Sequence, residues 1–189
     1  LVLTGLGGPG PLVYKRTRHG DRGIDRAAAH VVDRRGGEVR GYSPYGYDER
    51  QFNSIGFDLP VGRLSRTPHG EYPEYHTSAD DLSFVAPAEV AESYLAVLEM
   101  IDVLENDRRY ENLSPFGEPQ LGKRGIYPTT GGKQASDAVM AMLWVLAYAD
   151  GSTSLLDTAA VAGVDFAGLR AVPWWGWLGG ACAAAYVVA

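Results

Sequence analysis

Cysteine is nearly absent from this sequence, and positive charge is in deficit. The single cysteine, Cys182, can form no disulfide within the chain and excludes a cysteine-rich metal site. One thiol suits a reducing cytoplasm, which is the compartment we expect. The formal net charge of −6 opposes general attraction to polyanions. We therefore expect neither nucleic acid nor a membrane among the partners of this protein.

Long hydrophobic runs are also scarce. Residues 173–189 contain no charged side chain, but these 17 residues include helix-weakening glycines and reach only the lower limit for a membrane span. We expect an apolar, atypical tail there instead of a transmembrane helix. The chain starts with the strand-like residues Leu-Val-Leu-Thr, without an initiator methionine or a basic leader. We therefore expect it to begin inside a domain.

The first part of the chain alternates between strand and helix patterns. Asp21 is placed to cap a helix over residues 21–35, and Gly36 and Gly37 end that helix. A second helix is predicted over residues 87–106 from apolar residues at helical spacing: Val90, Tyr94, Val97, Leu98, Ile101 and Leu104. Strands separated by helices predict an α/β class with a layered sheet. The predicted strands are residues 1–6, 12–14, 39–42 and 61–64.

In the second part of the chain, from residue 133 on, the sequence predicts short helices around tight turns. Residues 150–151 read as a turn, Ser154 can cap a helix that Gly163 breaks, and Asp165 can start another. This pattern resembles the helix-turn-helix core of a winged helix. The chain thus divides into an α/β domain at 1–111, a Pro/Gly-rich connector at 112–132, a winged-helix-like domain at 133–172 and the apolar tail at 173–189.

The charge of the second part bears on its role. Residues 133–189 hold two basic and four acidic side chains, whereas a DNA-reading domain needs a basic face. We therefore interpret this region as a protein-contact or substrate-access element. A non-enzymatic interaction or regulatory module built on the winged helix is the alternative.

One histidine lies in a small, polar segment where an imidazole could meet a metal ion. His76 precedes Thr77, Ser78 and Ala79, whose small side chains leave room for a cation. Asp80, four residues on, could accept the second ring N–H and so fix the tautomer. On the local sequence alone, a histidine that only satisfies a hydrogen bond in a loop is the alternative.

Several separated segments resemble, in the same order, one known group of proteins. They read Pro-Tyr-Gly-Tyr-Asp-Glu-Arg-Gln at 44–51, Arg-Thr-Pro-His-Gly at 66–70 and Glu-Tyr-His-Thr-Ser-Ala-Asp at 74–80, and the segments at 118–127 and 142–146 also fit. On these residues the sequence resembles bacterial aminopeptidase-like zinc hydrolases. That group is related to the co-catalytic zinc aminopeptidases, carries a C-terminal winged helix and is classed as a domain of unknown function.

The resemblance implies a fold and a set of site residues. The fold is a partial three-layer αβα sandwich followed by a small winged-helix-like domain. His76 matches the family's His-Thr-x-x-Asp segment and would be a zinc ligand, with Glu74 and Asp80 as hydrogen-bond acceptors behind it. Asp48 and Glu49 resemble the family's Ser-Asp-His-x-x-Phe segment, with glutamate in place of histidine. Asp48 could orient a ligand, bind metal or simply cap the helix that follows.

Two further residues and a group of tyrosines lie near His76 in the sequence. Arg66 and His69 could steady an oxyanion or a substrate carboxylate, although a surface ion pair and a turn are the alternative interpretations. The tyrosines could line a pocket for an amino-acid side chain or could merely pack. They are Tyr42, Tyr45, Tyr47, Tyr72 and Tyr75.

The activity implied by the resemblance is zinc-dependent hydrolysis of an amide bond in a small peptide or amide substrate. In the family, the first zinc histidine, the bridging aspartate and the general-base glutamate come from an upstream half that this sequence does not contain. We therefore expect the chain alone to be inactive. A truncated or frame-shifted product is a further alternative, and assembly into a homo-oligomer stays open.

Overall fold

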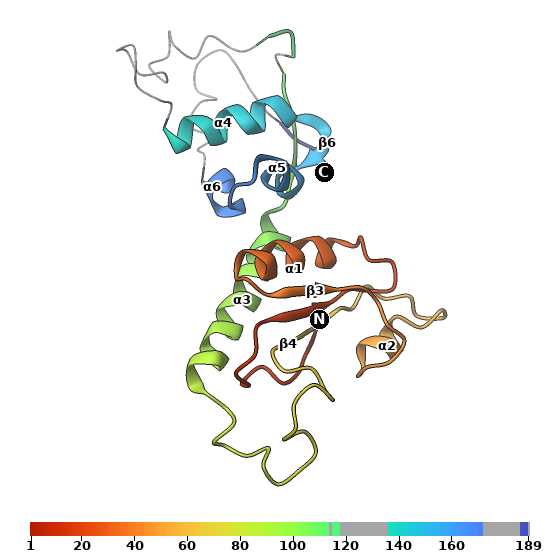
Figure 1. Ribbon diagram of the computed structural model, residues 1–189. Coiled ribbons are helices and arrows are strands. Elements are labelled where there is room, and N and C mark those ends of the chain that lie inside the picture. The colour runs from red at the N-terminus through yellow and green to blue at the C-terminus, as the bar shows by residue number, and fades with distance from the viewer. Residues whose placement is uncertain (114, 118–135, 172–185, 189) are drawn as a thin grey trace. The chain divides into compact units, whose positions relative to one another are not determined.

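The computed structural model describes residues 1–113, 115–117, 136–171 and 186–188 (Figure 1). The chain forms two compact units, Leu1–Glu105 and Asn106–Ala189, which we call unit 1 and unit 2. Unit 1 has helices packed around a mixed sheet, as expected for an α/β domain. Unit 2 combines short helices with a small antiparallel sheet.

The elements of unit 1 follow the predicted order, but its strands are shorter than predicted. They are β1 (Val2–Leu3), β2 (Val13–Lys15), α1 (Gly23–Arg34), β3 (Glu38–Arg40), α2 (Glu49–Phe52), β4 (Arg63–Ser65) and α3 (Pro87–Asn106). The strand order is β1-β4-β2-β3. β1 is parallel to β4, β2 is parallel to β3, and β2 and β4 are antiparallel.

The two central strands are buried along their whole length. Tyr14 of β2 pairs with Leu64 of β4, and neither side chain reaches solvent. The same strands also carry Lys15 and Arg63 into the interior, where they are 3% and 4% exposed. Two buried cations require nearby acceptors, and the α2 segment provides one.

The first helix is capped by a different aspartate from the one predicted. Arg22 is the N-cap residue, and the Asp25 carboxylate accepts its N–H at 3.0 Å. The prediction for Asp21 is therefore wrong, because an acid at the third helical position reaches back to the N-cap amide. The predicted end is confirmed, since the helix stops at Arg34 and Gly36 adopts φ +68.

The third helix has the predicted bounds but buries a different set of side chains. Its buried residues are Ser93, Ala96, Met100 and Val103. Arg35, which follows α1, joins Glu99 of α3 through Nη2 and Oε2 at 2.7 Å, so the two helices lie side by side. Most of the larger apolar residues that predicted the helix leave much of their surface exposed, and so does Leu95. The exposed residues are Val90, Tyr94, Leu95, Leu98, Ile101 and Leu104.

Unit 2 contains β5 (Arg109–Glu111), α4 (Asp137–Tyr148), β6 (Asp150–Ser154), α5 (Leu155–Ala162), α6 (Phe166–Arg170) and β7 (Tyr186–Val188). Ser154 caps α5 by accepting the Asp157 N–H at 3.2 Å, and Gly163 at φ +65 ends it, as predicted. The turn predicted at 150–151 is instead the start of β6, because this segment pairs with β5.

The apolar tail predicted at 173–189 lies outside the described residues apart from β7. The connector at 112–132 is described only at residues 112–113 and 115–117. Among the helices that the structure describes, none is long and apolar enough to cross a membrane.

Candidate functional site

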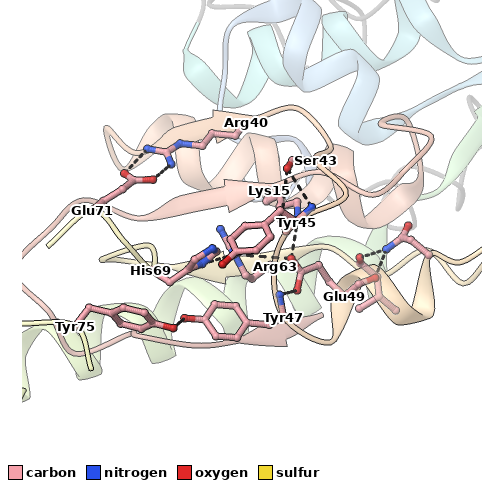
Figure 2. A network of polar contacts seen from close by, with 12 residues as sticks. Lys15, Arg40, Ser43, Tyr45, Tyr47, Glu49, Arg63, His69, Glu71 and Tyr75 are labelled. Atoms are coloured by element: carbon pink, nitrogen blue, oxygen red, sulfur yellow. Dashed lines mark hydrogen bonds and ion pairs between the residues drawn. The ribbon is translucent and has the colours of Figure 1, made fainter. Parts of the chain in front are cut away.

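Two loops of unit 1 converge on the buried cations of the central strands (Figure 2). One loop connects β3 to β4 and carries Tyr45, Tyr47 and the short helix α2. The other follows β4 and carries His69 and Tyr75. Residues that are far apart in the sequence therefore meet in one cluster of aromatic and charged side chains.

Glu49 is the acidic centre of this cluster. Its side chain is fully buried, and Oε1 accepts a hydrogen bond from Lys15 Nζ at 2.9 Å. Oε2 accepts the Tyr47 N–H at 3.0 Å, and Arg63 Nη1 lies 3.8 Å from Oε1. Both carboxylate oxygens are thus engaged inside the fold. This arrangement gives Glu49 a role in holding the two buried cations in place.

Close packing around the Lys15–Glu49 pair explains one glycine of the Tyr-Gly-Tyr-Asp-Glu segment. A Cβ atom added at Gly46 would lie 2.1 Å from Glu49 Oε1 and 2.8 Å from Lys15 Nζ. Lys15 Nζ also donates to the Tyr45 carbonyl at 2.8 Å. The backbone at Gly46 therefore lies so close to the ion pair that a side chain at this position would collide with it.

Arg63 joins the buried ion pair to His69. Its Nη1 lies 3.2 Å from His69 Nδ1, and its guanidinium carbon lies 5.5 Å from the centre of the Tyr47 ring. Three tyrosine rings surround the imidazole of His69, with centroids 5.2 Å (Tyr45), 4.9 Å (Tyr47) and 6.2 Å (Tyr75) away. Burial, followed by the positive charge of Arg63, lowers the pKa of His69 below its usual 6.5.

A pair of phenols continues the cluster toward the predicted metal ligand. Tyr47 Oη donates to Tyr75 Oη at 3.3 Å. Burial first, and then this hydrogen bond, raises the pKa of Tyr47 to about 12. The Tyr75 ring stacks on the imidazole of His76 with centroids 3.9 Å apart. The Tyr75 ring therefore neighbours the imidazoles of both His69 and His76.

His76 is exposed and its backbone is in an unusual conformation. Its φ of +59 lies in the left-handed region, which costs free energy for a residue other than glycine. Within the described part of the chain, no group of three or more histidine, cysteine, aspartate or glutamate side chains could hold a metal ion. The described residues therefore do not form a complete zinc site with His76.

The two acidic residues predicted to stand behind His76 make other contacts. Asp80 Oδ2 accepts a hydrogen bond from Tyr72 Oη at 3.4 Å. Glu74 contributes its carbonyl oxygen to Thr77, whose Oγ1 donates at 2.7 Å. The His76 ring rests on Tyr75 in this arrangement. The roles of Glu74 and Asp80 behind a metal ligand stay predictions.

Arg66 and Asp48 make their contacts outside the cluster around His69. Arg66 is buried and donates to Ser93 Oγ at 3.0 Å and to the Gly10 carbonyl at 2.7 Å, and it also pairs with Glu89 and Glu92. It thereby ties the loop after β4 to α3. Asp48 is exposed and precedes α2, where its carbonyl oxygen accepts the Gln51 N–H at 2.9 Å. Their catalytic roles stay predictions.

Lys15 and Arg63 are site residues that the sequence analysis missed. The available signal was a basic residue directly attached to an apolar strand run, because Lys15 follows Leu12, Val13 and Tyr14. A charged residue inside a buried strand needs a partner, but the sequence does not show that Glu49 is that partner. The tyrosine cluster, in contrast, was anticipated.

Residues 1–107 match the sequence family described as "Domain of unknown function (DUF4910)". The chain belongs to this DUF4910 family. Residues 108–173 match the family described as "winged helix-turn-helix". The two matches agree with the architecture, and the predicted fold class is confirmed as an α/β domain followed by a small winged-helix domain.

A curated relative and a solved structure, both from Clostridium acetobutylicum, carry names that refer to peptidases. One is called "Putative polysaccharide biosynthesis protein with aminopeptidase-like domain" and is 47% identical over 171 residues, which are 88% of this chain and 39% of the relative. The other is the crystal structure of a "putative peptidase", which is 38% identical with a TM-score of 0.84 and is matched over 99% of this chain and 41% of its own. The chain thus spans about two fifths of the relatives that it matches, and it is related to peptidase-like proteins.

Proposed function

We propose that this DUF4910 chain is part of a zinc-dependent, aminopeptidase-like hydrolase that cleaves an amide bond in a small peptide or amide substrate. The observation that carries the proposal is the exposed imidazole of His76, held at φ +59 beside the cluster of Tyr47, His69 and Tyr75. A costly backbone conformation at a potential metal donor is a feature of functional sites. The peptidase-like names of the longer relatives support the same reaction class.

A zinc site needs more donors than the described residues supply. Catalytic zinc takes three protein ligands and lowers the pKa of a bound water, whereas His76 is one donor. We therefore assign no step of the reaction to a metal held by this chain alone. In the proposal, His76 completes a site whose other ligands come from polypeptide that the longer relatives contain and this sequence does not.

The surface of unit 1 supports the presence of such a partner segment. β1 is an edge strand in the sheet order, and Leu3 within it is 48% exposed. On α3, large apolar side chains such as Leu98 and Ile101 are exposed, although the opposite set of side chains is buried. A helix that is apolar on two faces is normally covered on both. We infer that a further part of an α/β domain packs against α3 and β1.

The proposal is tested by complementation. This chain, with zinc, is assayed for release of amino acids from a panel of dipeptides, alone and mixed with the part of the Clostridium acetobutylicum peptidase to which it does not align. We expect hydrolysis only in the mixture, blocked by a chelator. Hydrolysis by the chain alone would show that the set of ligands is already complete, and no hydrolysis in a mixture that forms a stable complex would count against the reaction class.

Two matched substitutions test the role of His76. His76→Gln should abolish zinc-dependent hydrolysis in the mixture, because glutamine is a poor zinc ligand. His19→Gln is the control, since His19 is also exposed and pairs with Asp58 at 2.9 Å, outside the cluster. Equal activity of the His76→Gln variant and the unsubstituted protein would remove His76 from the site.

The alternative function, nucleic-acid binding by the winged helix, has less support. The described residues of unit 2 carry three basic side chains, Arg108, Arg109 and Arg170, against six acidic ones, which include Asp157 and Asp165. A DNA-reading helix neutralises phosphates with several basic side chains. We propose instead that unit 2 contacts protein or controls access of the substrate.

A further inference from the structure

We propose that Arg63 fixes His69 as a neutral imidazole with its proton on Nε2, and that His69 thereby binds an anionic oxygen of a ligand. The inference deepens the proposed function. It rests on that function only where it identifies the ligand as a substrate. The decisive contact is the 3.2 Å approach of Arg63 Nη1 to His69 Nδ1. A guanidinium group has only donors, so Nδ1 must accept and the remaining ring proton lies on Nε2.

The position of Arg63 is fixed by its surroundings. Its side chain is 5% exposed, and the guanidinium group lies against the Tyr47 ring at 5.5 Å and 3.8 Å from the Glu49 carboxylate. Lys15 binds the same carboxylate oxygen of Glu49, Oε1, at 2.9 Å. The donor on Nδ1 therefore belongs to a buried ion network and cannot turn away without breaking several contacts.

The charges that face His69 favour an anion over a proton or a metal cation. Arg63 and Lys15 each contribute one positive charge, and Glu49 contributes one negative charge, which leaves one positive charge in excess. Glu71, on the same loop as His69, accepts two hydrogen bonds from Arg40, which also pairs with Glu38, and its negative charge offsets the effect of the two cations on His69 only weakly. The buried cations oppose protonation of His69, in line with its lowered pKa.

The aromatic rings leave His69 partly accessible. The imidazole is half-buried among Tyr45, Tyr47 and Tyr75, and the Tyr45 side chain itself is 71% exposed. A hydrogen bond from Nε2 in this partly dry setting is stronger than one in open water. Both a substrate carboxylate and the oxyanion of a tetrahedral intermediate present the same anionic oxygen. His69 acts on either of them as a donor and not as a general base.

The tautomer of His69 can be measured directly in this chain. Long-range ¹H–¹⁵N correlation spectra at pH 7.5 should show a single neutral form, with Nδ1 unprotonated and Nε2 protonated. A protonated Nδ1, a charged ring or a mixture of tautomers at this pH would overturn the proposal. The measurement uses the unsubstituted protein, so its outcome does not depend on whether a variant folds.

Substitution of Arg63 tests its positioning role. In Arg63→Met the donor and the charge are lost, so the pKa of His69 should rise toward 6.5 and both neutral tautomers should appear. Arg63→Lys keeps the charge and should restore a lower pKa. A merely structural role for Arg63 predicts no change in the tautomer of His69 in a folded Arg63→Met variant, and that result would contradict the proposal.

The anion site is tested with acetate, and with acetamide as its neutral isostere. Titration with acetate should shift the His69 Nε2 resonance until the site is saturated, whereas acetamide should cause no shift. Arg63→Met should weaken the binding of acetate about tenfold. The absence of an acetate effect would overturn the anion site even if the complemented enzyme hydrolyses peptides. In that enzyme, faster cleavage of Ala-Ala than of Ala-Ala amide would assign the site to a substrate carboxylate, and equal cleavage would assign it to the oxyanion.

Discussion

Tyr14 donates its phenolic hydrogen to the Asp25 carboxylate over 2.9 Å at a place in unit 1 where neither side chain reaches solvent. Asp25 Oδ1 also accepts the Thr17 N–H at 2.8 Å, and Oδ2 accepts the Thr17 hydroxyl and the Arg22 N–H. One buried carboxylate thus links the central strand β2, the loop after it and the start of α1. The burial of Tyr14, together with the nearby negative charge, raises its pKa.

The first prediction concerns this carboxylate. Asp25→Ala should lower the free energy of unfolding of unit 1 by about 3 kcal/mol, because it leaves the buried donors of Tyr14 and Thr17 without an acceptor. Tyr14→Phe is the matched change and should cost about 1 kcal/mol, since Asp25 keeps its other donors. Native-state hydrogen exchange of the β2 and β4 amides gives both values. Equal costs for the two variants would argue against this hydrogen-bond network.

The second prediction concerns the ionisation of Tyr47. Its pKa is raised to about 12, so folding favours the neutral phenol. This contribution to stability is fully present below the ordinary pKa of 10.0 and is lost as the pH rises from there through about 12. In Tyr75→Phe the hydrogen bond is lost but the burial remains, so the pKa of Tyr47 should fall only part of the way to 10.0. NMR titration of ¹³Cζ-labelled tyrosine measures this shift, and an unchanged pKa would exclude the Tyr75 contact as a cause.

The third prediction separates the two faces of α3. Leu98→Lys and Ile101→Lys should change the free energy of unfolding by no more than about 0.5 kcal/mol, because both side chains are 43–48% exposed. Both should nevertheless prevent association with the complementing part of the Clostridium acetobutylicum peptidase.

Ala96→Lys is the control for the buried face of α3. It should cost more than about 3 kcal/mol, since a charge would enter a position that is 0% exposed. Hydrogen exchange and analytical ultracentrifugation measure the two effects. Normal association of the Leu98→Lys variant would show that this face is not the interface.

The fourth prediction concerns the capping of α5 in unit 2. Ser154→Ala should destabilise unit 2 by about 1 kcal/mol, because the Asp157 N–H loses its acceptor at 3.2 Å. Ser136→Ala, at the cap of α4, is the comparison and should cost about 0.5 kcal/mol, since Ser136 is exposed and its bond is longer at 3.4 Å. All four tryptophans lie after residue 143, so tryptophan fluorescence during urea unfolding reports on unit 2 alone. A larger loss for Ser136→Ala would reverse the expected ranking.

Several elements could be predicted because their signals are local. The bounds of α3, the cap at Ser154 and the helix end at Gly163 follow from side chains within a few residues of each element. The buried face of α3 could not be predicted in the same way. Large apolar residues occupy both faces, and the buried face includes the small side chains of Ser93 and Ala96 beside Met100 and Val103.

The candidate site shows the same limit more sharply. His69 and His76 were selected from sequence, and so was the tyrosine cluster. The contacts of the other predicted residues could not be read from the sequence, because a motif shows which residues are adjacent in the chain and not which side chains meet. Asp80 contacts Tyr72, and Arg66 serves α3.

The sequence by itself determined the α/β class, the acidic surface charge and the residue types available near His76, because composition and short-range periodicity carry that information. Only the tertiary structure decided that Lys15, Glu49 and Arg63 form one buried network and that this network ends on Nδ1 of His69. These residues come from two strands, a short helix and a loop, and the pairing of β2 with β4 places Lys15 beside Arg63. The protonation state of His69 is therefore a property of the fold.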